Sequence, residues 1–421
     1  MPDLLPRNVT PELVDLLQTF RIVVLGGARQ TGKTTLVREQ LNVPADATFS
    51  FDDGGTLGRA ERDPVGFVNG LPRPSAIDEF QRAGRDFLLA VKLRADRDNT
   101  RGQLLLTGSA NYLAMRGITE TLAGRAFRLT LWPLSAGERR GVRETFLDRL
   151  LDVEAWPPRV SSTLSRPDIA EWITEGGFPE IVTEGLSGRR RRQWFQAYVE
   201  EVLSREALRP MADVRMETEL RRVLSLLAAR TSQELVVSEL ANDAQLDRGT
   251  VANYVALLEA LHLIVQLPAW STNITTRVKR HSKVVLLDTG LAADLCGVGP
   301  KDFSPTADGC IAGALFETLV TTELFKQIGW AERTVDLFHF RDRAGPEVDI
   351  VVEDRRTGEV AGVEIKLTAT PKSRQTRHLA LLRDRLGARF TVGVLVHAGT
   401  QTLPMGPRLW AVPVSALWRT D

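Results

Sequence analysis

The stretch that most constrains this chain is Gly27–Thr34, which reads Gly-Ala-Arg-Gln-Thr-Gly-Lys-Thr. It matches the phosphate-binding loop pattern G-x-x-x-x-G-K-[ST] in full. The apolar, β-branched run 21–25 before it predicts a buried parallel strand, and residues 34–40 after it have helical composition. A strand, a glycine-rich loop and a helix in this order direct backbone N–H groups and a helix N-terminus at a phosphate. The sequence therefore predicts a nucleotide-binding site.

The side chains of this loop have separate expected roles. Lys33 would reach the β- and γ-phosphates, and the Thr34 hydroxyl would hold Mg²⁺. The expected nucleotide-binding residues of the loop are Gly27, Ala28, Gln30, Thr31, Gly32, Lys33, Thr34 and Thr35.

Length and composition limit the classes of protein to consider. The 421 residues suffice for two or three domains, and 43% hydrophobic with 25% charged residues is typical of a soluble globular protein. The net charge of +1 gives no global signal for nucleic acid or membrane, so such binding must come from local patches. No apolar run approaches the length of a membrane span, and no charged leader precedes an apolar core. Cys296 and Cys310 lack metal-site spacing. We expect a cytoplasmic protein with no membrane partner and no zinc.

An acidic pair follows the loop at the end of a second expected strand. Asp78 is the candidate for holding Mg²⁺ through water, and Glu79 is the candidate base that polarises the attacking water. Prolines crowd the short apolar run before Asp78, so a solvated turn is the alternative.

Two further candidates flank the next strands. Ser109, together with Thr107, ends the apolar run 103–109, and ligands collect at the carboxyl ends of strands in open α/β sheets. A simple strand cap is the alternative. Arg125 precedes the expected strand 126–131 and is a candidate charge-stabilising finger, from the same subunit or from a neighbour. An ordinary surface arginine is the alternative.

In order, these motifs resemble those of a bacterial and archaeal family of AAA-type ATPases. The family carries a C-terminal domain of unknown function with a restriction-endonuclease-like core. The resemblance implies that ATP is the nucleotide, that Asp78–Glu79 is the second acidic motif and that Ser109 lies at the sensor position. It also implies that Arg125 is a residue typical of the family, without assigning its role. The residues that carry it are Gly27–Thr34, Ile77–Gln81, Leu106–Ser109, Leu122–Arg125 and Pro133–Ser135.

The middle of the chain predicts helices and then a hairpin. Helical patterns at 217–230, from 236 and over 245–259, followed by a strand-like run 263–267, are typical of a winged helix. Its candidate recognition helix exposes Arg248, Thr250 and Asn253. DNA contact is one interpretation, and packing or subunit joining is the other. The basic run 189–192 beside aromatic residues favours an amphipathic helix over a nucleic-acid site.

The last part of the chain predicts a helix, strands and a carboxylate–lysine set. Asp349 lies in one strand, and Glu364 and Lys366 share one face of the next because side chains alternate along a strand. The order matches a restriction-endonuclease-like core. Asp349 and Glu364 would hold Mg²⁺, Lys366 would activate water, and Glu317 on the preceding helix would complete the metal set. An ordinary exposed ion pair, or a fold without the chemistry, is the alternative.

We therefore predict an α/β protein of three parts. Residues 1–150 form an AAA-like P-loop ATPase domain with a parallel sheet and helices on both faces. Residues 151–280 form a helical and winged-helix region, and residues 281–421 form a restriction-endonuclease-like α/β domain. The expected function is Mg²⁺-dependent ATP hydrolysis coupled to binding or cleavage of nucleic acid, chiefly DNA, with a homo-oligomer as a candidate assembly. The alternative is an ATP-dependent switch or scaffold whose nuclease-like domain binds a protein or DNA partner without cutting.

Overall fold

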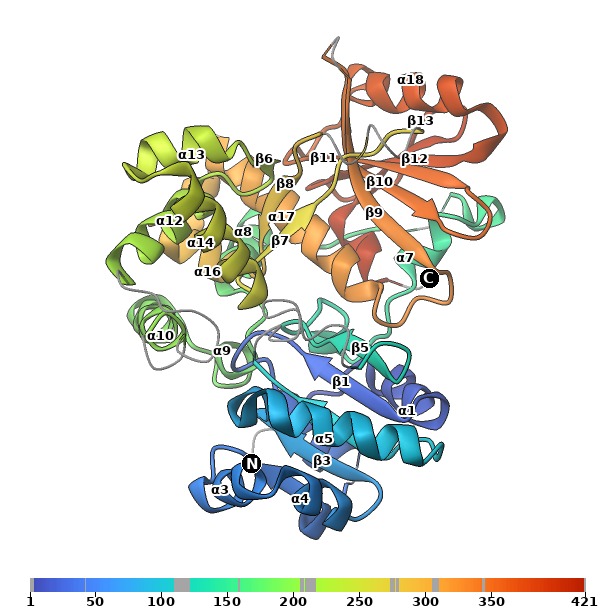
Figure 1. Cartoon of the computed structure of the whole chain (residues 1–421). Helices are drawn as coiled ribbons and strands as arrows, with labels where there is room; N and C mark the ends of the chain where they lie inside the picture. The colour runs from blue at the N-terminus through green and yellow to red at the C-terminus, as the bar shows by residue number, and fades with distance from the viewer. Residues whose placement is uncertain are drawn as a thin grey trace.

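The computed structural model describes residues 4–419 except 42, 110–121, 158–159, 205–207, 209–216, 273–276, 278–279, 305–309 and 343–344. Figure 1 shows three regions: an N-terminal sheet with its helices, a group of helices with a small sheet, and a C-terminal sheet. The long helix α17 (Cys310–Gln327) lies between them.

The N-terminal region is built on a parallel five-stranded sheet with the strand order β2-β3-β4-β1-β5. The phosphate loop follows β1, which lies between β4 and β5, and the acidic pair follows β3, so both lie at the carboxyl edge of the sheet. The strands are β1 (Ile22–Gly26), β2 (Thr48–Ser50), β3 (Ser75–Asp78), β4 (Leu104–Thr107) and β5 (Ala126–Thr130).

Helices cover both faces of this sheet, as the sequence predicted. Successive residues of a strand point to opposite faces. Val23 and Leu25 pack with Leu13 of α1 on one face, while Ile22 and Val24 belong to the core that includes α5 on the other. The helices are α1 (Thr10–Thr19), α2 (Lys33–Thr35) continued by η1 (Leu36–Gln40), α3 (Gly54–Arg62), α4 (Pro64–Gly70) and α5 (Gly84–Arg97).

The middle region contains helices and a three-stranded antiparallel sheet of order β6-β8-β7. Its central strand, β8 (Lys283–Leu286), lies beyond residue 280, so the small sheet extends past the boundary that the sequence suggested. The other elements are α8 (Arg166–Glu175), α9 (Pro179–Thr183), α10 (Gly188–Val202), α12 (Glu217–Ala229), β6 (Gln233–Glu234), α13 (Val237–Ala244), α14 (Arg248–Ala260), β7 (Ile264–Leu267) and α16 (Thr289–Leu295).

The C-terminal region is a mixed six-stranded sheet of order β13-β14-β12-β11-β10-β9. β9, β10 and β11 are antiparallel neighbours, and β11, β12 and β14 run parallel. The elements are β9 (Val335–Arg341), β10 (Glu347–Asp354), β11 (Val360–Lys366), α18 (Arg377–Leu386), β12 (Phe390–His397), β13 (Leu403–Gly406) and β14 (Leu409–Pro413).

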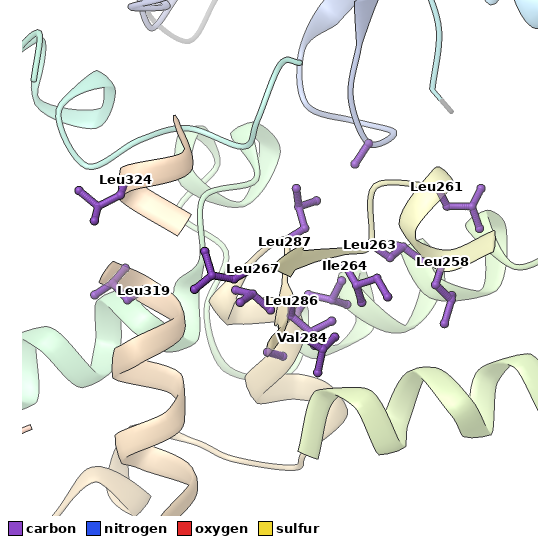
Figure 2. Packing of buried hydrophobic residues seen from close by; sticks show 14 of the residues in the cluster. Leu258, Leu261, Leu263, Ile264, Leu267, Val284, Leu286, Leu287, Leu319 and Leu324 are labelled. Carbon is purple, nitrogen blue, oxygen red and sulfur yellow. The ribbon is translucent and has the colours of Figure 1, made fainter. Parts of the chain in front are cut away.

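Helix α17 is buried because it packs against all three regions. It contacts β8 of the small sheet, β11 of the C-terminal sheet and α7 (Phe146–Arg149) after the N-terminal sheet. Figure 2 labels Leu319 and Leu324 on this helix and Leu267 and Leu286 on the small sheet, and all four belong to one cluster of buried apolar residues. One apolar core therefore continues through the three regions.

Candidate functional site

The phosphate loop keeps its shape through two glycines in left-handed conformations. Gly27 has a φ of 146° and Gly32 a φ of 89°. A Cβ at Gly27 would lie 2.2 Å from the carbonyl oxygen of Leu131, so no larger residue fits there. Thr31 is fully buried and its hydroxyl donates to the carbonyl of Ala28 at 2.9 Å. The motif therefore specifies a backbone shape and not only a set of side chains.

Lys33 is folded back onto its own loop. Its Nζ donates to the carbonyl oxygens of Gly27, at 2.9 Å, and of Ala28, at 2.7 Å. Burial lowers the pKa of Lys33 to about 8, although Glu79 and Asp78 act to raise it. A buried ammonium held only by carbonyl oxygens gains a stronger partner when an anion enters the loop.

Asp78 joins three segments at the carboxyl edge of the sheet. Its Oδ2 accepts a hydrogen bond from the Thr34 hydroxyl at 2.7 Å, and its Oδ1 accepts one from the Thr107 hydroxyl. The parallel register that pairs Ile77 with Leu106 brings Asp78 and Thr107 together. Carboxylate and hydroxyl oxygens are ligands that Mg²⁺ prefers, so Thr34 and Asp78 fit the predicted magnesium site.

Glu79 stands beside Asp78 in an uncommon backbone conformation, with a φ of 52°. Its Oε2 accepts hydrogen bonds from the Ser109 hydroxyl, at 3.1 Å, and from Nε2 of Gln81. Burial raises the pKa of the Glu79 carboxyl, and Lys33 opposes that shift. A non-glycine residue in the left-handed region is often associated with function, and here that conformation accompanies the contact between Glu79 and Ser109. The structure thus brings together the residues predicted for the metal, the base and the sensor.

Residues far from the motif also touch the phosphate loop. Arg7 donates to the carbonyl of Thr31 at 2.8 Å and pairs with Glu138. Glu201 at the end of α10 pairs with Arg29 at 2.9 Å and accepts from Gln30 at 3.3 Å. These contacts connect the loop to the N-terminal segment and to the middle region.

His262, just after α14, reaches the start of the same loop. A Cβ at Gly26 would lie 3.4 Å from its Nε2, which is buried and has no hydrogen-bond partner among the residues that the structure describes. Burial, together with the charge of Lys33, lowers the pKa of His262 to about 4. The middle region therefore contributes a neutral imidazole to the edge of the nucleotide site.

Arg125 lies at the other edge of the sheet. Arg125 precedes β5, and the first residue of β5, Ala126, pairs with Ile22 at the start of β1. The phosphate loop instead follows Gly26, at the end of β1. Four strand steps of about 3.3 Å separate these edges by roughly 13 Å. Arg125 forms an ion pair with Asp96 of α5 instead. Its guanidinium is therefore away from the phosphate loop of the same chain.

The C-terminal candidate residues converge around two lysines. Lys366 approaches Glu364 at 2.7 Å and Asp349 at 3.3 Å. Lys283 of β8 approaches Glu317 at 2.7 Å, Glu347 at 2.9 Å and Asp349 at 3.8 Å. Asp349 Oδ2 also accepts from the backbone N–H of Ile365 at 2.7 Å. All four predicted residues meet, together with two residues that were not predicted to belong to this site, Lys283 and Glu347.

Protonation at this cluster is strongly perturbed. Burial and the neighbouring Asp349 raise the pKa of Glu317 and of Glu364 to about 8. Burial acts to lower the pKa of Lys283, but Glu317, Asp349 and Glu347 raise it on balance. Carboxylates and lysines thus compensate one another inside the fold.

The expected metal-binding arrangement differs from this geometry. In the part of the chain that the structure describes, no three or more His, Cys, Asp or Glu side chains are arranged to hold a metal ion. The predicted set of Glu317, Asp349 and Glu364 surrounds ammonium groups instead. Lys283 could have been suspected from sequence, since a lysine that opens the apolar run Val284–Leu287 must find a buried partner.

The residues predicted for nucleic-acid contact occupy the middle region. On α14, Arg248 and Asn253 are exposed, and the Thr250 hydroxyl bonds to Asp247. In the basic run 189–192, Arg191 is buried against Glu171 while its neighbours are exposed. The charged face with an aromatic core face agrees with an amphipathic helix. Across the described residues, no helix is long and apolar enough to cross a membrane.

Comparison with protein families identifies the N-terminal region. Residues 19–139 match the family described as AAA domain. This part of the chain is an AAA-type P-loop ATPase domain. Residues 166–302 match the Domain of unknown function DUF8612, and residues 312–417 match the Domain of unknown function DUF4143. The DUF8612 match includes β8, in line with the extent of the small sheet.

Two similar proteins are each named an uncharacterized protein. An uncharacterized protein of Mycobacterium bovis and one of Mycobacterium tuberculosis are each 27% identical over 417 residues, covering 98% of this chain and 85% of theirs. Among solved structures, the RuvB Holliday junction branch migration motor of Thermotoga maritima is 17% identical with a TM-score of 0.29, covering 62% of this chain and 89% of that one.

Proposed function

We propose that this AAA-type domain performs Mg²⁺-dependent ATP hydrolysis and that its nucleotide state controls the C-terminal domain. The observation that carries the first part is that Asp78 accepts hydrogen bonds from the hydroxyl of Thr34, the last residue of the phosphate-loop motif, and from that of Thr107. A carboxylate beside the hydroxyl of the phosphate loop provides the oxygen ligands that would hold Mg²⁺ during phosphoryl transfer to water.

Each residue has a definite task in this proposal. Lys33 leaves the carbonyls of its loop and binds the β- and γ-phosphates, and the loop amides hold the phosphate chain. Glu79 takes the proton of the attacking water, while Ser109 and Gln81 hold the carboxylate in place. Mg²⁺ at Thr34 and Asp78 would neutralise charge on the phosphates.

The test of hydrolysis compares Glu79→Gln with Glu61→Gln, which alters an exposed carboxylate on α3 of the same domain. Glu79→Gln should keep ATP binding and lose turnover, whereas Glu61→Gln should match the wild type. Binding is measured with a fluorescent ATP analogue and turnover by phosphate release. Wild-type turnover in Glu79→Gln would remove that residue from the mechanism.

For the C-terminal domain we propose nucleic-acid binding or cleavage, with DNA as the first candidate. Support comes from the convergence of Asp349, Glu364 and Lys366 on adjacent strands after a buried helix. In a cleaving enzyme of restriction-endonuclease-like type, Asp349 and Glu364 would hold Mg²⁺ with Glu317, and Lys366 would orient the attacking water. Exposed basic side chains precede or lie on α18, among them Lys372, Arg374 and Arg377.

A second candidate is an ATP-dependent switch that binds a partner without cutting it. The pairing of the carboxylates with Lys283 and Lys366 favours this alternative, because their negative charge is compensated without a metal. Helix α17 provides the connection, since Glu317 lies on the same helix as Glu323, which accepts from the backbone N–H of Ala136 at 2.8 Å.

Cleavage assays separate the two candidates. Single- and double-stranded DNA and RNA are incubated with Mg²⁺, with and without ATP, using wild type, Asp349→Ala, Lys366→Ala and Lys33→Ala. Cleavage that disappears in Asp349→Ala and Lys366→Ala assigns a nuclease, and the Lys33→Ala result shows whether ATP controls it. Intact ATP hydrolysis with no cleavage of any substrate supports the switch.

A further inference from the structure

The C-terminal carboxylates are arranged around a positive charge that the chain itself provides. Lys283 is only 3% exposed, and its Nζ lies between Glu317 Oε1 at 2.7 Å and Glu347 Oε1 at 2.9 Å, with Asp349 Oδ1 at 3.8 Å. These three residues come from α17 and β10, whereas Lys283 comes from the small middle sheet. The cation and its ligands thus belong to different regions of the chain.

Several carboxylate oxygens of this cluster already face an ammonium or an N–H group, whereas Glu364 Oε2 is buried and has no hydrogen-bond partner among the described residues. Glu317 Oε1 and Glu347 Oε1 face Lys283, and Asp349 Oδ2 accepts from the N–H of Ile365 and from Lys366. Divalent cations bind oxygens at about 2.0–2.6 Å, closer than any of these nitrogen–oxygen distances. A metal ion between these oxygens would therefore have to displace the ammonium of Lys283.

Strand pairing fixes the backbone of Lys283 beside these carboxylates. Lys283 begins the central strand of the small sheet, where it pairs with Glu234 on one side and Leu267 on the other. The segment after β7 is joined to β9 by hydrogen bonds between Trp270 N and His339 O, at 2.6 Å, and between His339 N and Pro268 O, at 2.9 Å. The backbone that carries Lys283 is therefore held beside the edge of the C-terminal sheet, and the ion pairs with Glu317 and Glu347 hold its ammonium.

We propose that Lys283 is a tethered cation, which occupies the space between Glu317, Glu347 and Asp349 and keeps divalent metal ions out of this site. Metal binding between these carboxylates therefore requires that the ammonium of Lys283 is absent from the site. This inference concerns the control of the C-terminal site and rests on the function proposed for that site. It does not involve the ATPase centre.

The test measures Mn²⁺ binding and not catalysis. All proteins carry Asp78→Asn, which removes the predicted metal ligand at the ATPase centre, and no nucleotide is added. Bound Mn²⁺ is counted by electron paramagnetic resonance, and the shift of Tm with Mn²⁺ is recorded in parallel. We compare the chain with native Lys283 against Lys283→Met, which keeps the length without the charge, and Lys283→Arg, which keeps the charge.

Native Lys283 and Lys283→Arg should bind no Mn²⁺ at this site, while Lys283→Met should bind about one ion per chain with a rise in Tm. Adding Asp349→Asn to Lys283→Met should abolish that binding. Tight binding by the native chain that Asp349→Asn removes would overturn the proposal, and this measurement does not depend on folding of the Met variant. A folded Lys283→Met chain that binds no Mn²⁺ would overturn it as well.

The result is distinguishable from failure of the proposed function. If Lys283→Met binds Mn²⁺ but cleaves no DNA or RNA, the tethered cation stands and the nuclease proposal fails. If the native chain binds Mn²⁺ at Asp349 and cleaves, the nuclease proposal stands and the tethered cation fails.

Discussion

Lys33 at the phosphate loop and Lys283 at the C-terminal site are both buried lysines, but their ammonium groups meet different partners. Lys33 donates to two neutral carbonyl oxygens of its own loop, whereas Lys283 lies among three carboxylates from two other elements. The pKa of Lys33 is lowered by burial to about 8, and that of Lys283 is raised by its carboxylates. The first lysine can accept an arriving anion without losing an ionic partner, while the second already has several.

The contrast between the two lysines shows which contacts of a charged site are encoded by residues close together in the sequence. The partners of Lys33 precede it by only five and six residues. The partners of Lys283 lie 34 or more residues away along the chain. A short motif can predict the first arrangement, and only the tertiary fold creates the second.

Lys33→Ala should produce the largest effect on activity. We expect a loss of ATP turnover of about 10²–10³-fold or more, because a charged group aimed at the transferring phosphoryl is removed. Phosphate release at saturating ATP measures it. Lys301→Ala, at an exposed lysine of the same chain, serves as the control and should not change turnover. Near-normal turnover in Lys33→Ala would show that the ammonium of Lys33 is not needed for ATP hydrolysis.

Lys283→Met should produce the largest effect on stability in the absence of metal. Removing one partner from a buried ion-pair cluster costs about 3–5 kcal/mol, because Glu317 and Glu347 lose the ammonium that compensates them. Lys33→Ala removes only bonds to carbonyls and relieves a buried charge, so it should cost much less. Urea unfolding of both variants at neutral pH compares them directly. Equal losses in the two variants would contradict the electrostatic distinction.

The pH dependence of stability should differ between Glu364→Gln and the wild type. Burial, with Asp349 as the second cause, raises the pKa of Glu364 to about 8 in the folded chain. The protonated Glu364 carboxyl contributes its full share to the free energy of unfolding below about pH 4.3, the pKa of a Glu in the unfolded chain. This contribution is lost as the pH rises through about 8, the pKa in the folded chain. The wild type should therefore lose stability relative to Glu364→Gln across this range. Glu239→Gln, at an exposed position, is the control for urea unfolding at several pH values.

Arg125→Ala should have the smallest effect on stability, because its ion pair with Asp96 is partly exposed. Such solvent-exposed pairs contribute little to stability because water and salt screen them. If Arg125 serves a neighbouring subunit, Arg125→Ala should nevertheless lose turnover. Mixing it with Glu79→Gln should then restore part of the activity, because one chain supplies the arginine and the other an intact base. If the mixture of the two folded, inactive variants recovers no activity, Arg125 does not act on a neighbouring subunit.

Much of the ATPase site was predictable from sequence. Gly27 and Gly32 encode the loop conformation. Asp78 ends β3 and Ser109 follows the end of β4, so both lie at one edge of a parallel sheet. The position of Arg125 could also have been inferred. β1 and β5 are parallel, so their first residues lie at one edge of the sheet and their last residues at the other. Arg125 precedes β5, whereas the phosphate loop follows β1, and the two therefore lie at opposite edges.

Other contacts could not be read from the chain. Glu201 and His262 reach the phosphate loop only because the middle region folds against it. Glu347 and Lys283 meet because β8 lies beside the edge of the C-terminal sheet. Such contacts depend on how separate elements pack, and no periodicity or spacing in the sequence records that packing.

Helix α17 has a consequence for any attempt to separate the domains. Its Lys326 donates to the carbonyl of Leu134 at 3.1 Å, and Phe325 stacks on Trp132 with ring centroids 5.5 Å apart. Both partners belong to the segment that follows the ATPase sheet. Cutting the chain before this helix would leave an aromatic face and buried polar groups of the ATPase domain exposed to water. The ATPase domain should therefore unfold cooperatively with the C-terminal domain, and fragments made at the family boundaries would not retain the stability of the whole.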